Sequence, residues 1–223
     1  MPTQTGAQAQ SLCQSCGVVV PSELMLCESC ERLLPLPDRV SYFEFMELPL
    51  KLDIDLAALE KTFYRLSRLF HPDFYQNRPN SEQRAALERS ATLNKAYTTL
   101  KDPTRRAEYL MKLRGFEQST EKNRVPQDLM VEILELQEQL EEFQSSEGGE
   151  RERLAQALRA GVCELKERRA ELGKRLEDLF PIHDRAGEDR RAEILLEMRE
   201  TIDRSNYLFR IVENIEKTLE SGR

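Results

Sequence analysis

Apolar residues recur every three or four positions along most of this chain, and this spacing limits it to a largely helical fold. In the clearest case the apolar positions follow intervals of four, three and four and share one helix face: Leu59, Phe63, Leu66 and Phe70. The strand signal in the sequence is confined to a short run of valines at 18–20. The sequence therefore predicts an all-α protein.

A second helix is expected from about Ser81 to Leu100, followed by a shorter amphipathic segment over 104–113. Ser81 suits the N-cap position, because its hydroxyl can accept a hydrogen bond from a backbone N–H of the first turn. The sequence KDP at 101–103 ends this helix, since a residue before proline is pushed out of the helical region. Together these helices predict one domain over 41–118.

Three longer amphipathic patterns fill 119–223 and predict an antiparallel three-helix bundle, with turns at 145–150 and 180–189. Cys163 lies within the middle pattern and is expected to be a buried or half-buried small apolar residue. His183 lies in the second turn and is expected to be solvated. The apolar seams of the three patterns are Leu129, Ile133, Leu136, Leu140 and Phe143; Leu154, Leu158, Leu165, Leu172, Leu176 and Leu179; and Leu195, Met198, Ile202, Phe209, Val212 and Leu219.

The net charge of −7 arises in the C-terminal region, because residues 119–223 hold 25 acidic and 18 basic side chains, a difference of −7. No segment has the concentrated basic patch that is typical of nucleic-acid-binding proteins. No stretch approaches the roughly 18 apolar residues that a membrane-spanning helix needs, and residues 1–12 contain no Lys or Arg. We therefore expect no nucleic-acid or membrane partner, and a location in the bacterial cytoplasm, or in the mitochondrial matrix if a presequence has been removed.

Four cysteines near the N-terminus have the spacing of a metal site, C-x2-C-x10-C-x2-C: Cys13, Cys16, Cys27 and Cys30. Four thiolates suit Zn²⁺, and a fold of about 20 residues would draw its folding energy from the metal. The alternatives are reduced surface cysteines, redox-active pairs or an iron–sulfur centre. The sequence predicts a structural zinc-binding knuckle over 13–34, called the head below, between a flexible tail of 1–12 and a Pro-containing linker of 35–40.

The first predicted helix stops at a His-Pro-Asp motif, residues 71–73, because Pro72 keeps His71 out of the helical conformation. Three basic residues of this helix lie at intervals of four and three, on one face away from the apolar seam: Lys61, Arg65 and Arg68. The result is an exposed cationic stripe that ends in an imidazole and a carboxylate. A solvated helix face followed by an ordinary turn would show the same local pattern.

A second row of residues on the first bundle helix lies beside its buried seam: Met130, Leu134, Glu138 and Glu142, with Glu135 adjacent. Apolar residues bordered by carboxylates form a patch suited to contact with a partner protein. The alternative is that Met130 and Leu134 only widen the apolar stripe that faces the core.

The domain over 41–118 resembles the J-domain family. The resemblance is carried by YFEFMELP, the basic helix, the His-Pro-Asp motif and LNKAYTTLKDPTRRAEYL. It implies that the two long helices form an antiparallel hairpin. It further implies that His71, Pro72 and Asp73 stimulate ATP hydrolysis by a DnaK-type chaperone, and that Lys61, Arg65 and Arg68 dock on that chaperone. No catalytic group on this chain is then required, and the sequence lacks a phosphate-binding glycine loop. We expect that it is not an enzyme.

The acidic helical region that contains MVEILELQEQLEE is similar to the HscB-type co-chaperones of iron–sulfur cluster assembly. Some members of this group carry a tetracysteine head. The resemblance implies that the iron–sulfur scaffold protein IscU binds the row on the first bundle helix together with an aromatic residue on the last helix, here Tyr207. The chain would deliver this scaffold to a DnaK/HscA-type chaperone.

A different function is also open at this point. The chain can be a general J-domain chaperone or regulatory interaction protein without an iron–sulfur role, in which the bundle serves dimerisation.

Overall fold

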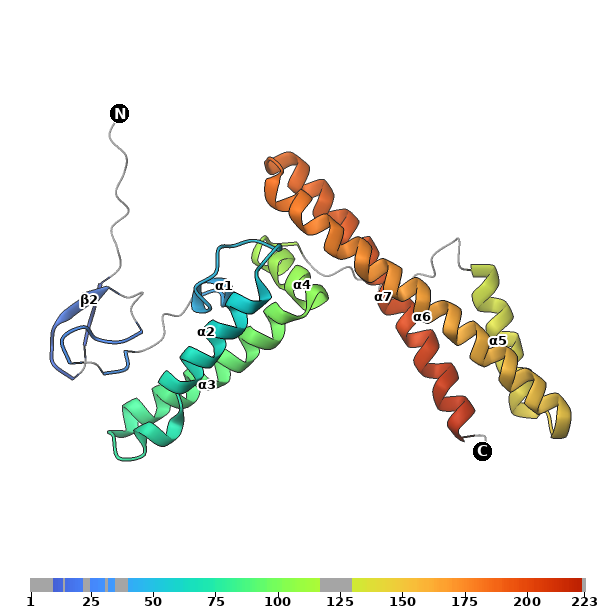
Figure 1. Cartoon of the computed structure of the whole chain (residues 1–223), viewed down its shortest axis with the longest axis horizontal. Coiled ribbons are helices and arrows are strands. Elements are labelled where there is room, and N and C mark those ends of the chain that lie inside the picture. The colour runs from blue at the N-terminus through green and yellow to red at the C-terminus, as the bar shows by residue number, and fades with distance from the viewer. Residues whose placement is uncertain are drawn as a thin grey trace. The chain divides into compact units, whose positions relative to one another are not determined.

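The structure is a computed structural model of the 223-residue chain that describes residues 10–13, 15–21, 25–30, 32–34, 40–116 and 130–221. Most of the predicted tail and linker, and Leu129 of the first bundle seam, lie outside these residues. The described part is predominantly helical, as the apolar spacing predicts (Figure 1). No helix among the described residues is both long enough and apolar enough to span a membrane. Contacts divide the chain into two compact units, Met1–Asp102 and Pro103–Arg223.

The one sheet among the described residues joins the head to the end of the predicted tail: β1 (Gln10–Leu12), in the tail, pairs antiparallel with β2 (Val19–Pro21) of the head. Between them the backbone N–H of Gly17 donates to the carbonyl of Cys13 at 2.8 Å, and Gly17 has a positive φ of 72° that favours glycine. An isolated bridge joins Leu26 to Leu33. The head thus consists of two small turns that each carry a pair of cysteines.

The rest of the first unit is a helical hairpin preceded by a short helix. Helix α1 (Tyr42–Phe45) begins with a capping box. Helix α2 (Leu56–Leu69) begins at Asp55, whose carboxylate accepts hydrogen bonds from the first turn. It packs against α3 (Asn80–Lys101), as Figure 1 shows. The hairpin core contains the predicted seam residues Leu59, Leu66 and Phe70, while Phe63 is half-buried and stacks on the ring of Tyr97.

The predicted N-cap of the second helix is wrong. Helix α3 begins at Asn80, so Ser81 already lies inside the helix, and Pro79 occupies the cap position without a side-chain hydrogen bond. The backbone N–H groups of Glu82 and Gln83 donate instead to the carbonyl of Pro79, at 2.9 and 3.1 Å. The φ of Pro79 is fixed near the helical value by its ring, so this residue can lead directly into the helix.

The second unit contains α4 (Pro103–Leu113), α5 (Met130–Ser145), α6 (Gly148–Arg185) and α7 (Glu188–Ser221). Helices α6 and α7 pack along each other, α5 packs on α6, and α4 contacts both α6 and α7 (Figure 1). The sequence analysis grouped the segment of α4 with the preceding hairpin, whereas its contacts place it in the second unit. The predicted seams are buried with two exceptions: Leu172 is half-buried, and Phe209 is 43% exposed because its neighbours Tyr207 and Leu208 occupy the core.

The second predicted turn is shorter than the sequence indicates. Helix α6 continues through Pro181 to Arg185, and only Ala186 and Gly187 separate it from α7. Proline removes one helical hydrogen bond, and burial of the neighbouring Phe180 offsets this loss.

The expected exposure of two single residues in α6 is wrong. His183 is 3% exposed and its Nδ1 lies 3.0 Å from Oδ1 of Asp184, because the helix continues and carries it into the interior. Cys163 is exposed, because it lies on a helix position that faces away from the bundle core.

Candidate functional sites

The His-Pro-Asp motif forms a tight turn directly after α2. Phe70 is the C-cap of α2, and Pro72–Tyr75 form a short 3-10 helix, η1. His71 has the extended backbone that a following proline requires, with φ −62° and ψ 123°. Its Nδ1 accepts a hydrogen bond from the backbone N–H of Asp73 at 3.4 Å. The imidazole is therefore held in one turn with the carboxylate, whose Oδ2 lies 3.7 Å from the same nitrogen.

The polar side chains of this turn face solvent. The side chains of His71 and Asp73 are 51% and 69% exposed. Oδ1 of Asp73 accepts a hydrogen bond from Nε2 of Gln76 at 3.2 Å. Phe74 is 69% exposed, and its ring centroid lies 5.9 Å from that of His71. A partner protein can therefore reach an imidazole, a carboxylate and an aromatic ring on one surface.

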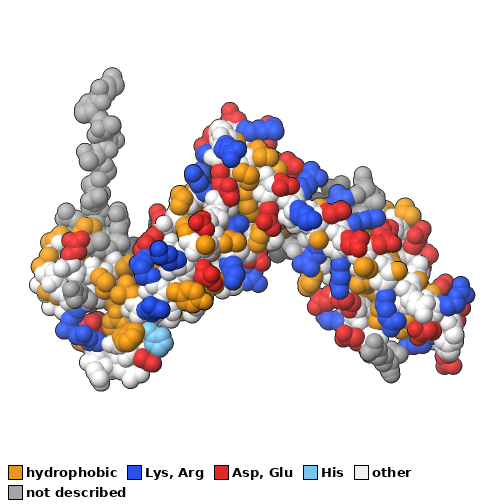
Figure 2. All heavy atoms as spheres, viewed as in Figure 1, with side chains coloured by type: hydrophobic (Ala, Val, Ile, Leu, Met, Phe, Trp, Pro, Cys, Tyr) orange, Lys and Arg blue, Asp and Glu red, His pale blue; other side chains and the backbone are white. Residues whose placement is uncertain are grey.

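The three predicted basic residues lie on the exposed side of α2, next to this turn: Lys61, Arg65 and Arg68. Figure 2 shows Lys and Arg side chains over the hairpin beside a histidine and carboxylates. Arg65 pairs with Glu47, and both side chains are about half exposed, at 51% and 52%. Such a surface pair contributes little to stability, so it leaves Arg65 able to exchange Glu47 for a carboxylate on a partner.

The four cysteine sulfur atoms of the head lie within 4.8 Å of one another. The Sγ atoms of Cys13 and Cys30 are 3.6 Å apart, as are those of Cys16 and Cys27, and all four are free thiols. A tetrahedral ion with Zn–S bonds of about 2.3 Å separates its sulfur ligands by about 3.8 Å. The cluster therefore has the dimensions of a site for one metal ion.

The electrostatics of the cluster also fit a cation. Backbone N–H groups of Cys16 and Ser15 lower the pKa of the Cys13 thiol to about 6. The backbone N–H of Arg32 acts in the same direction on Cys30, but burial and the neighbouring thiols outweigh it and raise the pKa of Cys30 to about 12. Burial and the closeness of the thiols thus disfavour a cluster in which all four cysteines are deprotonated. A bound divalent cation would stabilise the four thiolates.

The first turns of α5 expose an apolar surface bordered by carboxylates. Met130 is 44% exposed, Leu134 is 52% exposed and Val131 is 69% exposed. Three glutamates of the same helix are also exposed: Glu135, Glu138 and Glu142. Met130 and Leu134 therefore lie outside the buried core, and their role in binding a partner stays a prediction. Together with Val131 and the three glutamates they form the α5 face.

Tyr207 is not exposed alongside the α5 face. It is 9% exposed and belongs to the buried core of the bundle, and burial raises the pKa of its hydroxyl. The guanidinium of Arg210 lies 5.7 Å from the centroid of its ring. A role of Tyr207 in binding a partner stays a prediction.

Comparison with known proteins gives two kinds of match. The family model of the DnaJ domain matches residues 41–109. The crystal structure of human co-chaperone protein HscB matches 95% of this chain and 98% of its own, at 25% sequence identity and a TM-score of 0.67. The structure of chaperone HscB from Vibrio cholerae matches 82% of this chain and 99% of its own, at 25% identity and a TM-score of 0.58. The chain carries a J-domain and has an HscB-like fold.

Two features of this J-domain protein were missed from the sequence. Phe74 directly follows the motif. It is apolar but belongs to none of the periodic apolar patterns, and this was the available signal that it is exposed. Val131 lies between two residues of the predicted row, but the row was read at intervals of four, and this spacing passes over Val131. Both are among the most exposed large apolar side chains in the described part of the chain.

Proposed function

We propose that this protein is a co-chaperone that joins two proteins. Its J-domain stimulates ATP hydrolysis by a DnaK/HscA-type chaperone, and its α5 face holds the iron–sulfur scaffold protein IscU. One observation carries the proposal: an exposed His-Pro-Asp turn ends a basic helix, in a chain whose fold matches that of the HscB co-chaperones over nearly its whole length.

The chemistry of the turn supports chaperone docking. The carboxylate of Asp73 can accept charge-assisted hydrogen bonds from an arginine on the chaperone, and such bonds are about twice as strong as neutral ones. The basic side chains of Lys61, Arg65 and Arg68 favour approach of an acidic surface. The protein would act on the ATPase of its partner and would need no catalytic group of its own.

The α5 face, in the second unit, has the chemistry of a protein-binding surface. Its exposed apolar side chains, Met130, Val131 and Leu134, can be buried against a partner. Glu135, Glu138 and Glu142 would pair with basic groups at the rim. A chain that binds both proteins raises the effective concentration of each for the other.

The head would hold a structural Zn²⁺ ion through Cys13, Cys16, Cys27 and Cys30. The ion would supply most of the folding free energy of a region with so small a core. The proposed compartment is the bacterial cytoplasm, or the mitochondrial matrix for a chain that has lost a presequence.

The steady-state ATPase rate of the chaperone, measured with and without the scaffold, tests the proposal. We expect the scaffold and this protein together to stimulate the rate more than the sum of their separate effects. His71→Gln should abolish stimulation and leave scaffold binding unchanged. Leu134→Ala should weaken scaffold binding about tenfold, a typical loss for an apolar anchor, and leave stimulation without scaffold unchanged.

The pattern of losses separates the two candidate functions. Stimulation that is indifferent to the scaffold would support the general J-domain protein and contradict the iron–sulfur role. Loss of both activities in His71→Gln would contradict the division of labour between the J-domain and the α5 face.

A further inference from the structure

Helix α3 carries two buried charges on the face that meets the head. Glu82 and Arg89 are seven residues apart, so about two helical turns separate them on one face. Glu82 is 7% exposed and Arg89 is fully buried, at 0%. Charged side chains are almost never this buried unless they are paired. The partners of these two residues therefore decide whether α3 can keep them inside.

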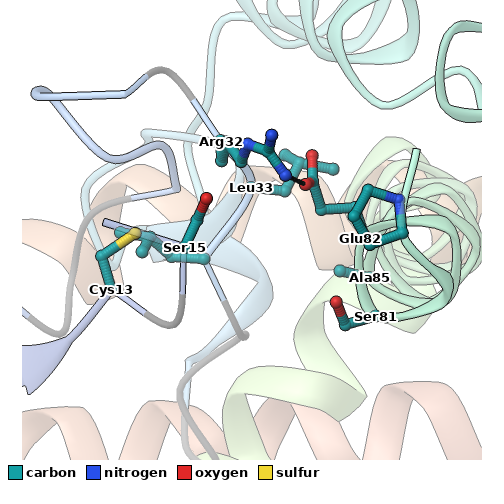
Figure 3. A pocket seen from close by; sticks show the side chains of 9 residues that line it. Cys13, Ser15, Arg32, Leu33, Ser81, Glu82 and Ala85 are labelled. Carbon is teal, nitrogen blue, oxygen red and sulfur yellow. Dashed lines mark hydrogen bonds and ion pairs between the residues drawn. The ribbon is translucent and has the colours of Figure 1, made fainter. Parts of the chain in front are cut away.

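Both charges are paired by the head. Arg89 donates from Nη1 to the carbonyl of Met25 at 2.6 Å and from Nη2 to the carbonyl of Leu34. Glu82 accepts a hydrogen bond from Nη1 of Arg32 at 2.5 Å, the contact drawn as a dashed line in Figure 3. If the head leaves, Arg89 and Glu82 lose these partners at once, and water must replace every one of the bonds.

Part of the head is separated from α3 by an open space. A cavity of about 310 Å³ lies between the head and α3, with Cys13 and Leu34 on one side and Pro79 and Ala85 on the other. Figure 3 shows Arg32 and Glu82 meeting across this space. The bonds of Glu82 and Arg89 therefore join the head to α3 in a region where the two surfaces do not fully meet.

The other side of Arg89 touches the His-Pro-Asp turn. Its guanidinium lies 5.1 Å from the centroid of the Phe70 ring, and Phe70 is the C-cap that directly precedes His71. Tyr75, which ends η1, donates from its hydroxyl to the carbonyl of Leu69 at 2.8 Å. Burial raises the pKa of Tyr75, and the charge of Arg89 opposes this rise. Arg89 therefore contacts the head on one side and Phe70, the residue directly before His71, on the other.

We propose that Arg89 is a positioning residue through which the metal-bearing head fixes the His-Pro-Asp turn, so that loss of the metal lowers stimulation of the chaperone. The part that concerns stimulation rests on the proposed function. The part that concerns the coupling between head and turn does not, and it can be measured without any chaperone.

The test compares the Zn²⁺-loaded full chain with Arg89→Met, which keeps much of the side-chain volume and removes the charge and its donors. Two readouts are needed: the rate of Zn²⁺ transfer to a chromogenic chelator, and hydrogen exchange of the backbone amides of 70–75. We expect both rates to rise by at least about tenfold, because each hydrogen bond to a charged group contributes roughly this factor or more. Arg84→Met, on the exposed side of the same helix, is the matched control and should change neither rate.

A second variant keeps the test valid if Arg89→Met does not fold. Arg32→Gln lies in the head and removes the charged partner of Glu82, while Arg89 and its bonds to the head are kept. It should speed Zn²⁺ release, by a smaller factor than Arg89→Met. Removal of the metal from the unaltered chain should speed exchange in 70–75 in the same way.

The outcomes separate the two proposals. Faster metal release and faster exchange in Arg89→Met support the coupling, even if the unaltered protein fails to stimulate the chaperone and the proposed function falls. Rates in Arg89→Met equal to those in Arg84→Met overturn the coupling, even if the unaltered protein stimulates normally. Stimulation by the metal-free protein equal to that by the loaded protein overturns the functional part.

Discussion

The head and the α5–α7 bundle differ in what holds them together. The described core of the head consists of Cys13, Val20, Cys27 and Leu34, so two of its four members are candidate metal ligands. The main cluster of the bundle contains 14 buried residues from three long helices, and none of them belongs to a candidate metal site in the described part of the chain. We therefore expect the head to depend on a metal ion and the bundle to depend on buried apolar surface.

This difference predicts how the stability of each region responds to the substitution of a single side chain. In the bundle, removal of one side chain leaves most of the buried apolar surface in place. In the head, removal of one ligand takes away part of the core and the metal together.

Loss of one metal ligand should have the largest effect. We expect Cys27→Ser, at a position 1% exposed, to remove most of a metal-binding free energy on the order of 10 kcal/mol. Zinc content and thiol titration measure the result: no bound Zn²⁺ and rapid reaction of the remaining head thiols, with a nearly unchanged helical signal in circular dichroism. Cys163→Ser, at an exposed cysteine outside the cluster, is the control and should keep its metal. Retention of one Zn²⁺ with protected thiols in Cys27→Ser would show that the head does not depend on the full ligand set.

A substitution that creates a cavity in the bundle should have an intermediate effect on stability and should leave the head unchanged. Leu158 on α6 is 0% exposed, so Leu158→Ala should lower the free energy of unfolding by about 2–5 kcal/mol. Urea unfolding followed by the helical signal measures this loss, and zinc content should not change. Leu196→Ala, at a position 56% exposed, should stay within about 0.5 kcal/mol. Equal losses in both variants would mean that the second unit lacks the packed core seen in the structure.

Local patterns predicted much of this molecule. The spacing of apolar residues identified helices α2, α5, α6 and α7, because a period of about 3.6 residues can be recognised within a single segment of sequence. The metal cluster and the turn were found for the same reason, since their residues are close in sequence. The resemblance to J-domain and HscB-type proteins then supplied roles that no spacing could supply.

Contacts between distant segments could not be predicted in this way. Arg89 bonds to carbonyls 64 and 55 residues earlier in the chain, and nothing in the sequence around it indicates that it is buried. His183 was assigned to a turn over 180–189, but α6 continues through Pro181 to Arg185, and His183 is buried with Phe180. Tyr207 is buried although the sequence analysis expected it to contact a partner, because the side of a long helix that faces the core depends on its packing partners.

A close helix contact gives the smallest and sharpest test of the bundle. A Cβ atom added to Gly161 on α6 would lie 2.5 Å from Cδ2 of Leu136 on α5, closer than real contacts allow, whereas one added to Gly173 on the same helix would meet nothing within 4 Å. Alanine is favoured over glycine by about 1 kcal/mol within a helix. Gly173→Ala should therefore stabilise the bundle by up to about that amount.

Gly161→Ala should instead destabilise the bundle by about 1 kcal/mol, because the overpacking at Leu136 exceeds the gain in helix propensity. Urea unfolding of the two variants measures the difference in sign. Because Leu136 lies on the helix that carries the α5 face, Gly161→Ala should also weaken scaffold binding, while chaperone stimulation without scaffold stays unchanged. If both alanine variants stabilise the protein equally, α5 can move away from α6 at little cost, and the α5 face is then not held in place by the bundle.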